Sequence, residues 1–323
     1  MNDRGMIYLT ILVVAMFGPM AHGAEPKEPR KATGEFLLRT AVKPFKGVNP
    51  KDTDAEVPCS YWVPKNYDPK GQEVHRVFVY LIWKPDAFIE WTDQNGMFLL
   101  YLPFKDELCY WYGFGHEKII VDALAELKKR YRISSDQVFI YGESRAASMV
   151  NAFVSTKPEY VSAWAGGVTT FFREPIPRMK HIPGLLLQSE GDDGLYQAAQ
   201  HFHAKCRKLD IPVLWRSYAN IGHEVSEEGW TLAKAFFEYH HHQTKHLLAN
   251  RTRPSLMDRK NALGPVRHVG DMQDWVYYPV GDARIPEIPE MQRVELPSES
   301  VAKAWADAEA MKSVVDRMAR KQK

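Results

Sequence analysis

The stretch "VFIYGESRAASMV", residues 138–150, decides how the chain is interpreted. A run of β-formers stops at Gly142, and small, helix-compatible residues follow Ser144. A strand, a sharp turn and a helix are therefore predicted, with one serine at the apex of the turn. A serine in this place is either a small residue that the turn tolerates or an exposed nucleophile. The rest of the chain decides between the two.

Strand and helix patterns alternate on both sides of this turn. Apolar runs at residues 75–85, 137–142, 160–168, 182–191 and 212–220 predict strands, and residues 117–131, 144–158, 195–210 and 227–246 predict helices. Such alternation predicts an α/β protein with a mostly parallel sheet covered by helices on both faces. We expect one domain over residues 35–248, after a polar stretch rich in Lys and Pro, and an irregular aromatic segment over residues 86–116.

Composition narrows the class of protein. The chain has 323 residues, 25% charged residues and a formal net charge of +2, and its Lys and Arg are scattered, so no nucleic-acid partner is indicated. Residues 1–23 combine Arg4, an apolar run and small residues up to Gly23, which is typical of a cleaved signal peptide. We therefore expect a secreted or periplasmic protein without stable membrane insertion after cleavage.

Neither the cysteines nor the C-terminal extension is assigned a catalytic role. There are three cysteines; Cys59 with Cys109 is the predicted pair, the alternative being that all three are small buried apolar residues. Residues 249–323 predict two short strands and a terminal amphipathic helix with Ser298 as N-cap, and a helix stripe of this kind packs against a neighbour. The run His240–His242 cannot converge on one metal ion, and a solvated helix end is expected there.

A serine nucleophile needs a base, an acid that orients the base, and N–H donors for the oxyanion. In a parallel α/β sheet these groups come from loops at the carboxyl ends of strands. Two later predicted strands run into such loops, the first with Asp192 and Asp193 and the second with His223. The order Ser144, Asp192, His223 is that of α/β-hydrolase sites. Asp192 could also cap the following helix, in which case Asp193 would orient the base.

From "CSYWVPKNYDP" (residues 59–69) to the helix after His223 the chain resembles secreted α/β hydrolases of the polyhydroxybutyrate-depolymerase and feruloyl-esterase type. Their Gly-x-Ser-x-Gly motif corresponds to Gly142–Ala146, where alanine replaces the second glycine. In these families the catalytic aspartate lies three residues after the residue that ends the strand and three residues before an apolar one. Ser189, Asp192 and Leu195 match this spacing, which favours Asp192 as the acid. The resemblance implies an α/β-hydrolase fold with a C-terminal extension, and neither a metal nor an organic cofactor.

The resemblance also assigns the oxyanion donors. The family carries His-Gly after its third strand, where this chain has "LIWKPD", so the amide of Trp83 or Lys84 is expected to replace it. The second donor is expected from the N–H of Arg145, whose guanidinium could bind an anionic substrate or the oxyanion, as the arginine after the elbow serine of glucuronoyl methylesterases suggests. The aromatic residues after this strand are expected to wall the acyl pocket in part.

Three functions are compatible with these sequence features. The first is a secreted serine hydrolase of carboxylic esters, of the polysaccharide-linked or polyester type. The second is an exported peptidase of the same fold, which the order and spacing of the triad cannot separate from an esterase. The third is a binding protein on a hydrolase scaffold without catalysis.

Overall fold

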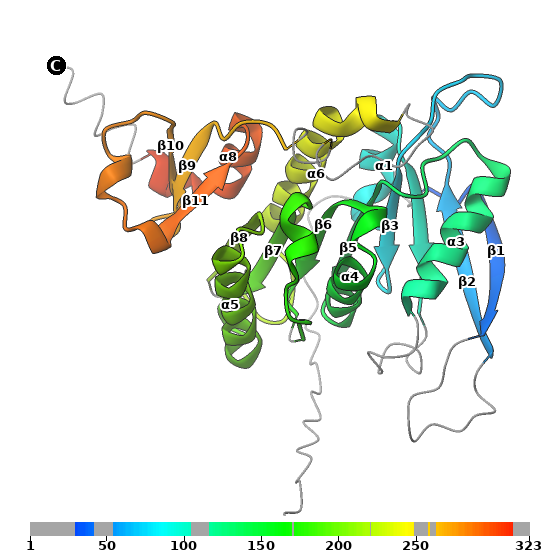
Figure 1. Cartoon of the computed structure of the whole chain (residues 1–323), viewed down its shortest axis with the longest axis horizontal. Helices are drawn as coiled ribbons and strands as arrows, with labels where there is room; N and C mark the ends of the chain where they lie inside the picture. The colour runs from blue at the N-terminus through cyan, green and yellow to red at the C-terminus, as the bar shows by residue number, and fades with distance from the viewer. Residues whose placement is uncertain are drawn as a thin grey trace, which may run out of the picture.

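An eight-stranded sheet forms the centre of the molecule, with helices on both faces (Figure 1). The structure is a computed structural model that describes residues 30–41, 54–104, 116–169, 171–219, 221–248, 258 and 263–312. The predicted signal peptide lies outside these residues. Within them, no helix combines the length and the apolar character needed to cross a membrane.

The sheet has the order β1-β2-β4-β3-β5-β6-β7-β8. Strands β3 to β8 run parallel, while β2 pairs antiparallel with both β1 and β4. The strands are β1 (Gly34–Ala41), β2 (Asp54–Trp62), β3 (Val77–Leu81), β4 (Phe98–Leu102), β5 (Val138–Glu143), β6 (Val161–Gly167), β7 (Gly184–Ser189) and β8 (Val213–Tyr218). All five residues of β3 are buried, because parallel strands are covered on both faces and their sequences are apolar throughout.

Two apolar cores lie on the two faces of the sheet. The first joins the sheet to α3 (His116–Arg130), α4 (Arg145–Thr156) and α5 (Asp193–Lys208). The second joins it to α1 (Asp86–Gln94), α6 (Glu227–Leu248) and α8 (Glu299–Trp305). Short 3-10 turns lie at Pro158–Tyr160, Pro177–His181, Ile285–Glu287 and Glu290–Gln292. The predicted α/β class and mostly parallel sheet are confirmed.

In the main sheet and its helices, three elements were missed by the sequence patterns. The segment expected to be irregular contains α1 and β4, and β1 lies in the polar stretch rich in Lys and Pro, where no strand was predicted. Strand β1 is an edge strand whose residues alternate between exposed and partly buried, and its apolar residues Phe36, Leu37 and Leu38 stand within a stretch that is otherwise polar. Strand β4 is a short run of largely buried apolar residues, which periodicity alone does not separate from other buried segments.

The C-terminal residues form a second, three-stranded sheet of order β10-β9-β11 beside the end of the main sheet (Figure 1). Its strands are β9 (His268–Asp271), β10 (Val276–Pro279) and β11 (Arg293–Leu296). The Ser298 hydroxyl caps α8 by accepting from the Val301 N–H at 3.2 Å. Trp305 is fully buried, and its indole N–H donates to the carbonyl of Trp215 in β8 at 2.7 Å. The predicted terminal helix carries an apolar stripe that includes Val301, Trp305, Val315 and Met318, and the last two lie outside the described residues.

Two side-chain predictions are wrong. His240 and His241 are buried on the inner side of α6, where burial and the nearby Arg76 lower the pKa of each to about 3. Cys59 and Cys206 are free, buried thiols, so the predicted disulfide of Cys59 is not formed, and Cys109 lies outside the described residues. Burial raises the pKa of both thiols to about 12, which suits the alternative of small apolar core residues.

Candidate active site

Ser144 occupies a strained turn between β5 and α4. Its backbone has φ 52° and ψ −123°, a conformation that costs free energy for a residue with a side chain. Its N–H donates to the Gly167 carbonyl at 2.8 Å, which fixes the turn to the neighbouring strand β6. A Cβ on Gly142 would lie 2.7 Å from the backbone of Ala146, so only glycine allows α4 to fold back this closely. The turn holds the Ser144 side chain out at the carboxyl end of the sheet.

The structure brings together the three residues predicted as nucleophile, base and acid. The Ser144 Oγ lies 2.7 Å from the His223 Nε2, and the His223 Nδ1 lies 2.5 Å from the Asp192 Oδ2. With the Nδ1 proton donated to the carboxylate, Nε2 is left to accept the serine proton. The histidine side chain is 43% exposed and the aspartate 23%, so the imidazole edge is accessible from solvent.

Asp192 stands at the N-cap position of α5, the place that the helix-capping alternative assigns to it. Its side chain makes no capping hydrogen bond and bonds to His223 instead, while its carbonyl accepts from the Leu195 N–H at 2.9 Å. Asp193 is the first residue of α5, and its side chain lies outside the described part of the chain.

The acid loop and the histidine loop are bonded to each other. The Ser189 hydroxyl, at the end of β7, donates to the carbonyl of Ile221 in the loop before α6. A Cβ on Gly191 would come within 2.5 Å of the same carbonyl, so a glycine is required for this close approach. These contacts hold Asp192 and His223 at a fixed separation.

The loop after β3 forms a tight turn centred on Ile82. Ile82 has φ 72°, which is unusual for a β-branched residue, and the Trp83 N–H donates back to the Leu81 carbonyl at 3.0 Å. The carbonyl of Ile82, in the same peptide group as the Trp83 N–H, accepts from the Tyr101 hydroxyl at 2.9 Å. Both polar groups of this peptide are therefore already used.

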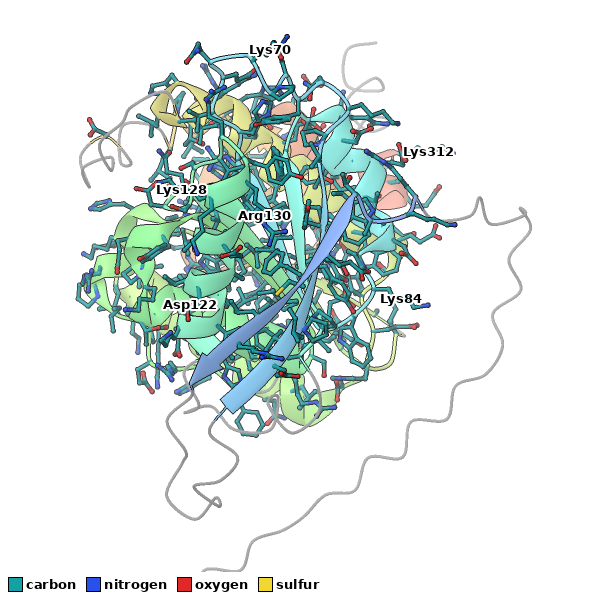
Figure 2. The ribbon with its side chains drawn as sticks, turned by 90° about the vertical axis from the view of Figure 1, so that its right-hand side faces the viewer. Lys70, Lys84, Asp122, Lys128, Arg130 and Lys312 are labelled. Carbon is teal, nitrogen blue, oxygen red and sulfur yellow. The ribbon has the colours of Figure 1, made fainter. Side chains whose placement is uncertain are left out.

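Of the two residues predicted to supply the amide after β3, the loop geometry favours Lys84. Its N–H makes no hydrogen bond to any described residue, unlike that of Trp83. The Lys84 side chain is exposed and reaches the surface in Figure 2, far from Lys70, which precedes β3. Arg145 is the first residue of α4, and the first N–H groups of a helix have no acceptor within the helix.

Two residues were not assigned a role by sequence reasoning. Tyr101, in β4, orients the loop after β3 through its bond to Ile82. Glu143 lies directly before the nucleophile, and its carboxylate accepts from the Tyr141 hydroxyl and the Trp230 indole. The contact of Tyr101 could not be predicted because it lies in β4, a strand that the patterns missed. The contacts of Glu143 could not be predicted because Trp230 is distant in the sequence.

The aromatic residues after β3 are divided by burial. Trp91, Phe98 and Phe104 are buried in the cores, so they do not line an open acyl pocket, and residues 105–115 lie outside the described part of the chain. Among the residues that the structure describes, the exposed large aromatic side chains are Trp83 at 46% and Phe171 at 60%. Trp83 follows β3 and Phe171 follows β6, the strands on either side of β5, which ends at Ser144.

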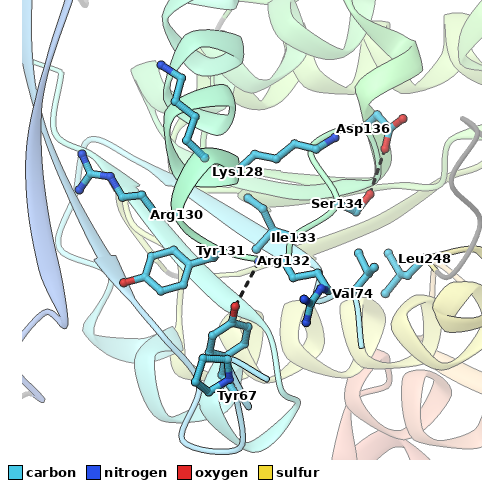
Figure 3. Close-up of a pocket in the computed structure, with 12 residues that line it drawn as sticks. Tyr67, Val74, Lys128, Arg130, Tyr131, Arg132, Ile133, Ser134, Asp136 and Leu248 are labelled. Carbon is cyan, nitrogen blue, oxygen red and sulfur yellow. Dashed lines mark hydrogen bonds between the residues drawn. The ribbon is translucent and has the colours of Figure 1, made fainter. Parts of the chain in front are cut away.

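A surface hollow of about 560 Å³ lies elsewhere, at the amino ends of β3 and β5 (Figure 3). There the Tyr67 hydroxyl accepts from the Arg132 N–H at 3.2 Å, and the Ser134 hydroxyl donates to Asp136 at 3.0 Å. Its lysines and arginines stand at the end of α3, where cations favour the helix terminus. The hollow shares no residue with the Ser144 site, and we assign it no chemistry.

Within the described residues, no group of three or more His, Cys, Asp or Glu side chains is placed to hold a metal ion. No protein-family model and no curated protein sequence matches the chain. Similar folds are found among solved structures.

Three of these structures are a thermostable esterase, the acylaminoacyl peptidase of Pyrococcus horikoshii and a CE1 ferulic acid esterase of Anaeromyces mucronatus. The esterase is 17% identical with a TM-score of 0.44, and the match covers 57% of this chain and 55% of the esterase. The peptidase is 12% identical with a TM-score of 0.48, and the match covers 66% of this chain and 42% of the peptidase. The ferulic acid esterase is 11% identical with a TM-score of 0.48, and the match covers 66% of this chain and 91% of the esterase.

The strand order, the antiparallel β2 and the strand–serine–helix turn are those of an α/β hydrolase, as predicted. The chain therefore has the α/β-hydrolase fold. The match spans less than two thirds of the length of the thermostable esterase and of the acylaminoacyl peptidase. The activities of those proteins are therefore not assigned to this chain.

Proposed function

We propose that this protein is a serine hydrolase that cleaves carboxylic esters. The observation that carries the proposal is the continuous relay from Asp192 through His223 to Ser144, at 2.5 and 2.7 Å, on a strained turn. A strained backbone at a serine with this hydrogen-bond partner supports a catalytic role over a packing role.

In the proposed reaction the Ser144 Oγ attacks the ester carbonyl while the His223 Nε2 takes its proton. The N–H groups of Lys84 and Arg145 stabilise the oxyanion of the tetrahedral intermediate. His223 then gives the proton to the leaving alcohol, and an acyl-serine remains. Water, deprotonated by His223, then attacks the acyl group; the acid is released as the Ser144 Oγ leaves and takes the proton back from His223. This sequence needs neither a metal nor an organic cofactor.

The substrate class that we propose is an ester with a ring or a polymer on one side, either polysaccharide-linked or of polyester type. Its support is the pair of exposed aromatic side chains, Trp83 and Phe171, on loops that flank the nucleophile strand. The Trp83 indole N–H donates to the Glu143 carbonyl at 3.3 Å, which holds the ring beside the turn. An exposed, held aromatic ring offers a stacking surface for a sugar or an aryl group.

We place the protein outside the cytoplasm, secreted or periplasmic, because residues 1–23 have the pattern of a cleaved signal peptide. No nucleic-acid partner is proposed. An exported peptidase remains the second candidate, since the same relay serves amide bonds.

A fluorophosphonate probe tests the proposal. We expect covalent labelling of the wild-type protein and hydrolysis of short p-nitrophenyl esters, together with slower or no hydrolysis of the matched p-nitroanilides. A folded wild-type protein that neither labels nor hydrolyses any ester would reject catalysis and favour a binding protein. Faster cleavage of the anilides would favour the peptidase.

A further inference from the structure

Strand β1 forms one edge of the main sheet. It pairs with β2 over all eight of its residues, from Gly34 to Ala41, without a register shift. Within the described residues, no strand pairs with its outer side. At the other end of the sheet, β8 is contacted by Trp305 and by β11. An unpaired edge offers its backbone N–H and C=O groups to another strand, so β1 is the side of the sheet that can be extended.

The exposed side chains of β1 decide what can pair with it. Its sequence, GEFLLRTA, contains no proline to block pairing. Leu37 is 50% exposed and stands between two exposed charged residues, Glu35 and Arg39, on the same face of the strand. Figure 2 faces this edge, where β1 crosses in front of β2 and the labelled Asp122 and Arg130 of α3 lie beside it. Charges on an edge strand discourage pairing unless the incoming strand carries the opposite charges in register.

A second copy of β1 carries those charges in register. When two identical strands pair antiparallel at their edges, the two-fold axis stands perpendicular to the sheet, so each residue stays on its own face. In the register that sets Leu37 opposite itself, Glu35 lies opposite Arg39 of the second copy, and Arg39 lies opposite its Glu35. The neighbouring registers that keep the faces matched would instead set Leu37 against a charged residue.

The other face of β1 is compatible with the same axis. Phe36 and Leu38 are partly buried against the core beside α3, and in this register each lies opposite the other in the second copy. A hollow of about 460 Å³ lies between β1 and α3. The helix residues that line it carry both signs of charge, so a copy of the same face meets no uniform repulsion; they are Asp122, Glu126, Lys129 and Arg130.

The contacts that these charged residues make within the chain leave room for a second partner. The Arg39 Nε lies 2.8 Å from the Glu56 Oε1 of β2, and the two side chains are 77% and 56% exposed. The Glu35 carboxylate accepts from the Ser60 hydroxyl at 3.4 Å. A guanidinium has five N–H donors, so Arg39 can bind Glu56 and the Glu35 of a second copy together.

We propose that two copies of the chain associate through β1, with a two-fold axis at Leu37 that joins their main sheets into one continuous sheet. Because the two copies run antiparallel, their β5 strands end in opposite directions along the joined sheet. No residue of the Ser144 site lies on β1. The proposal is therefore independent of the proposed hydrolase function.

Charge reversal tests the register. Sedimentation equilibrium of the wild-type protein should show a dimer that dissociates on dilution. Glu35→Arg and Arg39→Glu each set like charges opposite each other at both ends of the pairing, so each should raise the dissociation constant by roughly tenfold or more. An equal mixture of the two variants should restore the dimer, since opposite charges then meet at both ends. Glu56→Gln, which removes only the partner of Arg39 within the chain, should dimerise like wild type.

Cross-linking tests the position of the axis. Residues directly opposite each other in an antiparallel pair have Cα atoms about 4.5–5.5 Å apart, a separation that a disulfide can span. Leu37→Cys should therefore give a disulfide-linked dimer on mild oxidation. The background carries Cys109→Ser, since the other two cysteines are buried. Lys31→Cys, an exposed position before β1, is the matched control and should not cross-link, because the two copies of residue 31 lie at opposite ends of the pairing.

Three results would overturn the proposal. One is a wild-type protein that stays monomeric up to its highest soluble concentration. Another is a dimer that persists undiminished in both charge-reversal variants, which would place the interface elsewhere. The third is a mixture of these two variants that stays monomeric, or cross-linking that is equal at positions 31 and 37, since either would reject the register.

Discussion

The Asp192 Oδ2 lies 2.5 Å from the His223 Nδ1, although Asp192 occupies the N-cap position of α5. The side chain that could cap the helix reaches to the next loop, and the helix keeps only the backbone bonds of Asp192. The first turn of α5 thus gives up a stabilising cap worth about 1 kcal/mol so that the histidine can be oriented.

The first prediction separates the two adjacent aspartates. Asp192→Asn should lower kcat by about three to four orders of magnitude, because an amide can hold the imidazole in the wrong tautomer. Asp193→Asn, the matched control one residue further, should stay close to wild type. Ester hydrolysis by both purified variants gives the measurement, and a larger loss for D193N would assign the acid to the neighbouring residue.

The nucleophile is tested by Ser144→Ala. Labelling by a fluorophosphonate should disappear, and turnover of p-nitrophenyl esters should fall by about three orders of magnitude or more. The circular dichroism spectrum should not change, because the turn is held by the Ser144 N–H and not by its hydroxyl. Ser148→Ala, which removes a buried hydroxyl of the same helix, serves as the control and should still label.

The oxyanion amide after β3 is tested by removing a backbone N–H. Lys84→Pro deletes the donor, whereas Lys84→Ala removes only an exposed side chain. We expect K84P to lower kcat about 100-fold to 1,000-fold, the scale for losing one oxyanion donor. K84A should be near wild type. Equal activity of the two variants, with unchanged melting temperatures, would exclude this amide.

Arg145→Ala keeps the backbone N–H of the residue after the nucleophile and removes the guanidinium. If the side chain binds a substrate carboxylate, as we expect, KM for an acidic ester such as a methyl glucuronate should rise while neutral esters are unaffected. A fall of kcat for every ester would assign the guanidinium to the oxyanion instead. Unchanged kinetics with lower stability would mean a structural role.

The raised pKa of Glu143 predicts a pH-dependent stability. A carboxyl whose pKa is higher in the folded than in the unfolded chain stabilises the fold below its unfolded value, 4.5, and this stabilisation is lost as pH rises through the folded value. The free energy of unfolding of E143Q minus that of wild type should therefore increase from pH 4 to pH 8. Urea titrations at several pH values measure it, and a constant or falling difference would contradict the prediction.

The sequence predicts the centre of this fold better than its margin. The elbow at Ser144 is local: an apolar strand, Gly142 and small helix residues are adjacent in the chain, so their pattern carries the geometry. Strand β1 was missed because half of its residues face solvent at the sheet edge, and β4 because five apolar residues do not reveal a period. Strands β1 and β4 both lie next to strands that the patterns predicted.

The relay residues could be predicted because α/β sheets bring the carboxyl ends of strands together. The contacts of Glu143 could not, since Trp230 is 87 residues away and no motif links the two. The burial of His240 and His241 follows from how α6 lies on the sheet, which a run of three histidines does not reveal. The Trp83 amide is used within the tight turn at Ile82, which Tyr101 of the missed strand holds in place.

The indole of Trp305 that meets the Trp215 carbonyl has a consequence for solubility. Strand β8 is the last of the large sheet, and an open outer strand offers its backbone to any other strand of the same kind. Here one outer carbonyl is taken by Trp305, and Arg207 of α5 binds the backbone of the C-terminal segment at the Glu290 carbonyl, at 2.7 Å. A chain cut after α6 would lose these contacts and leave more of the edge of β8 open to pairing with another strand.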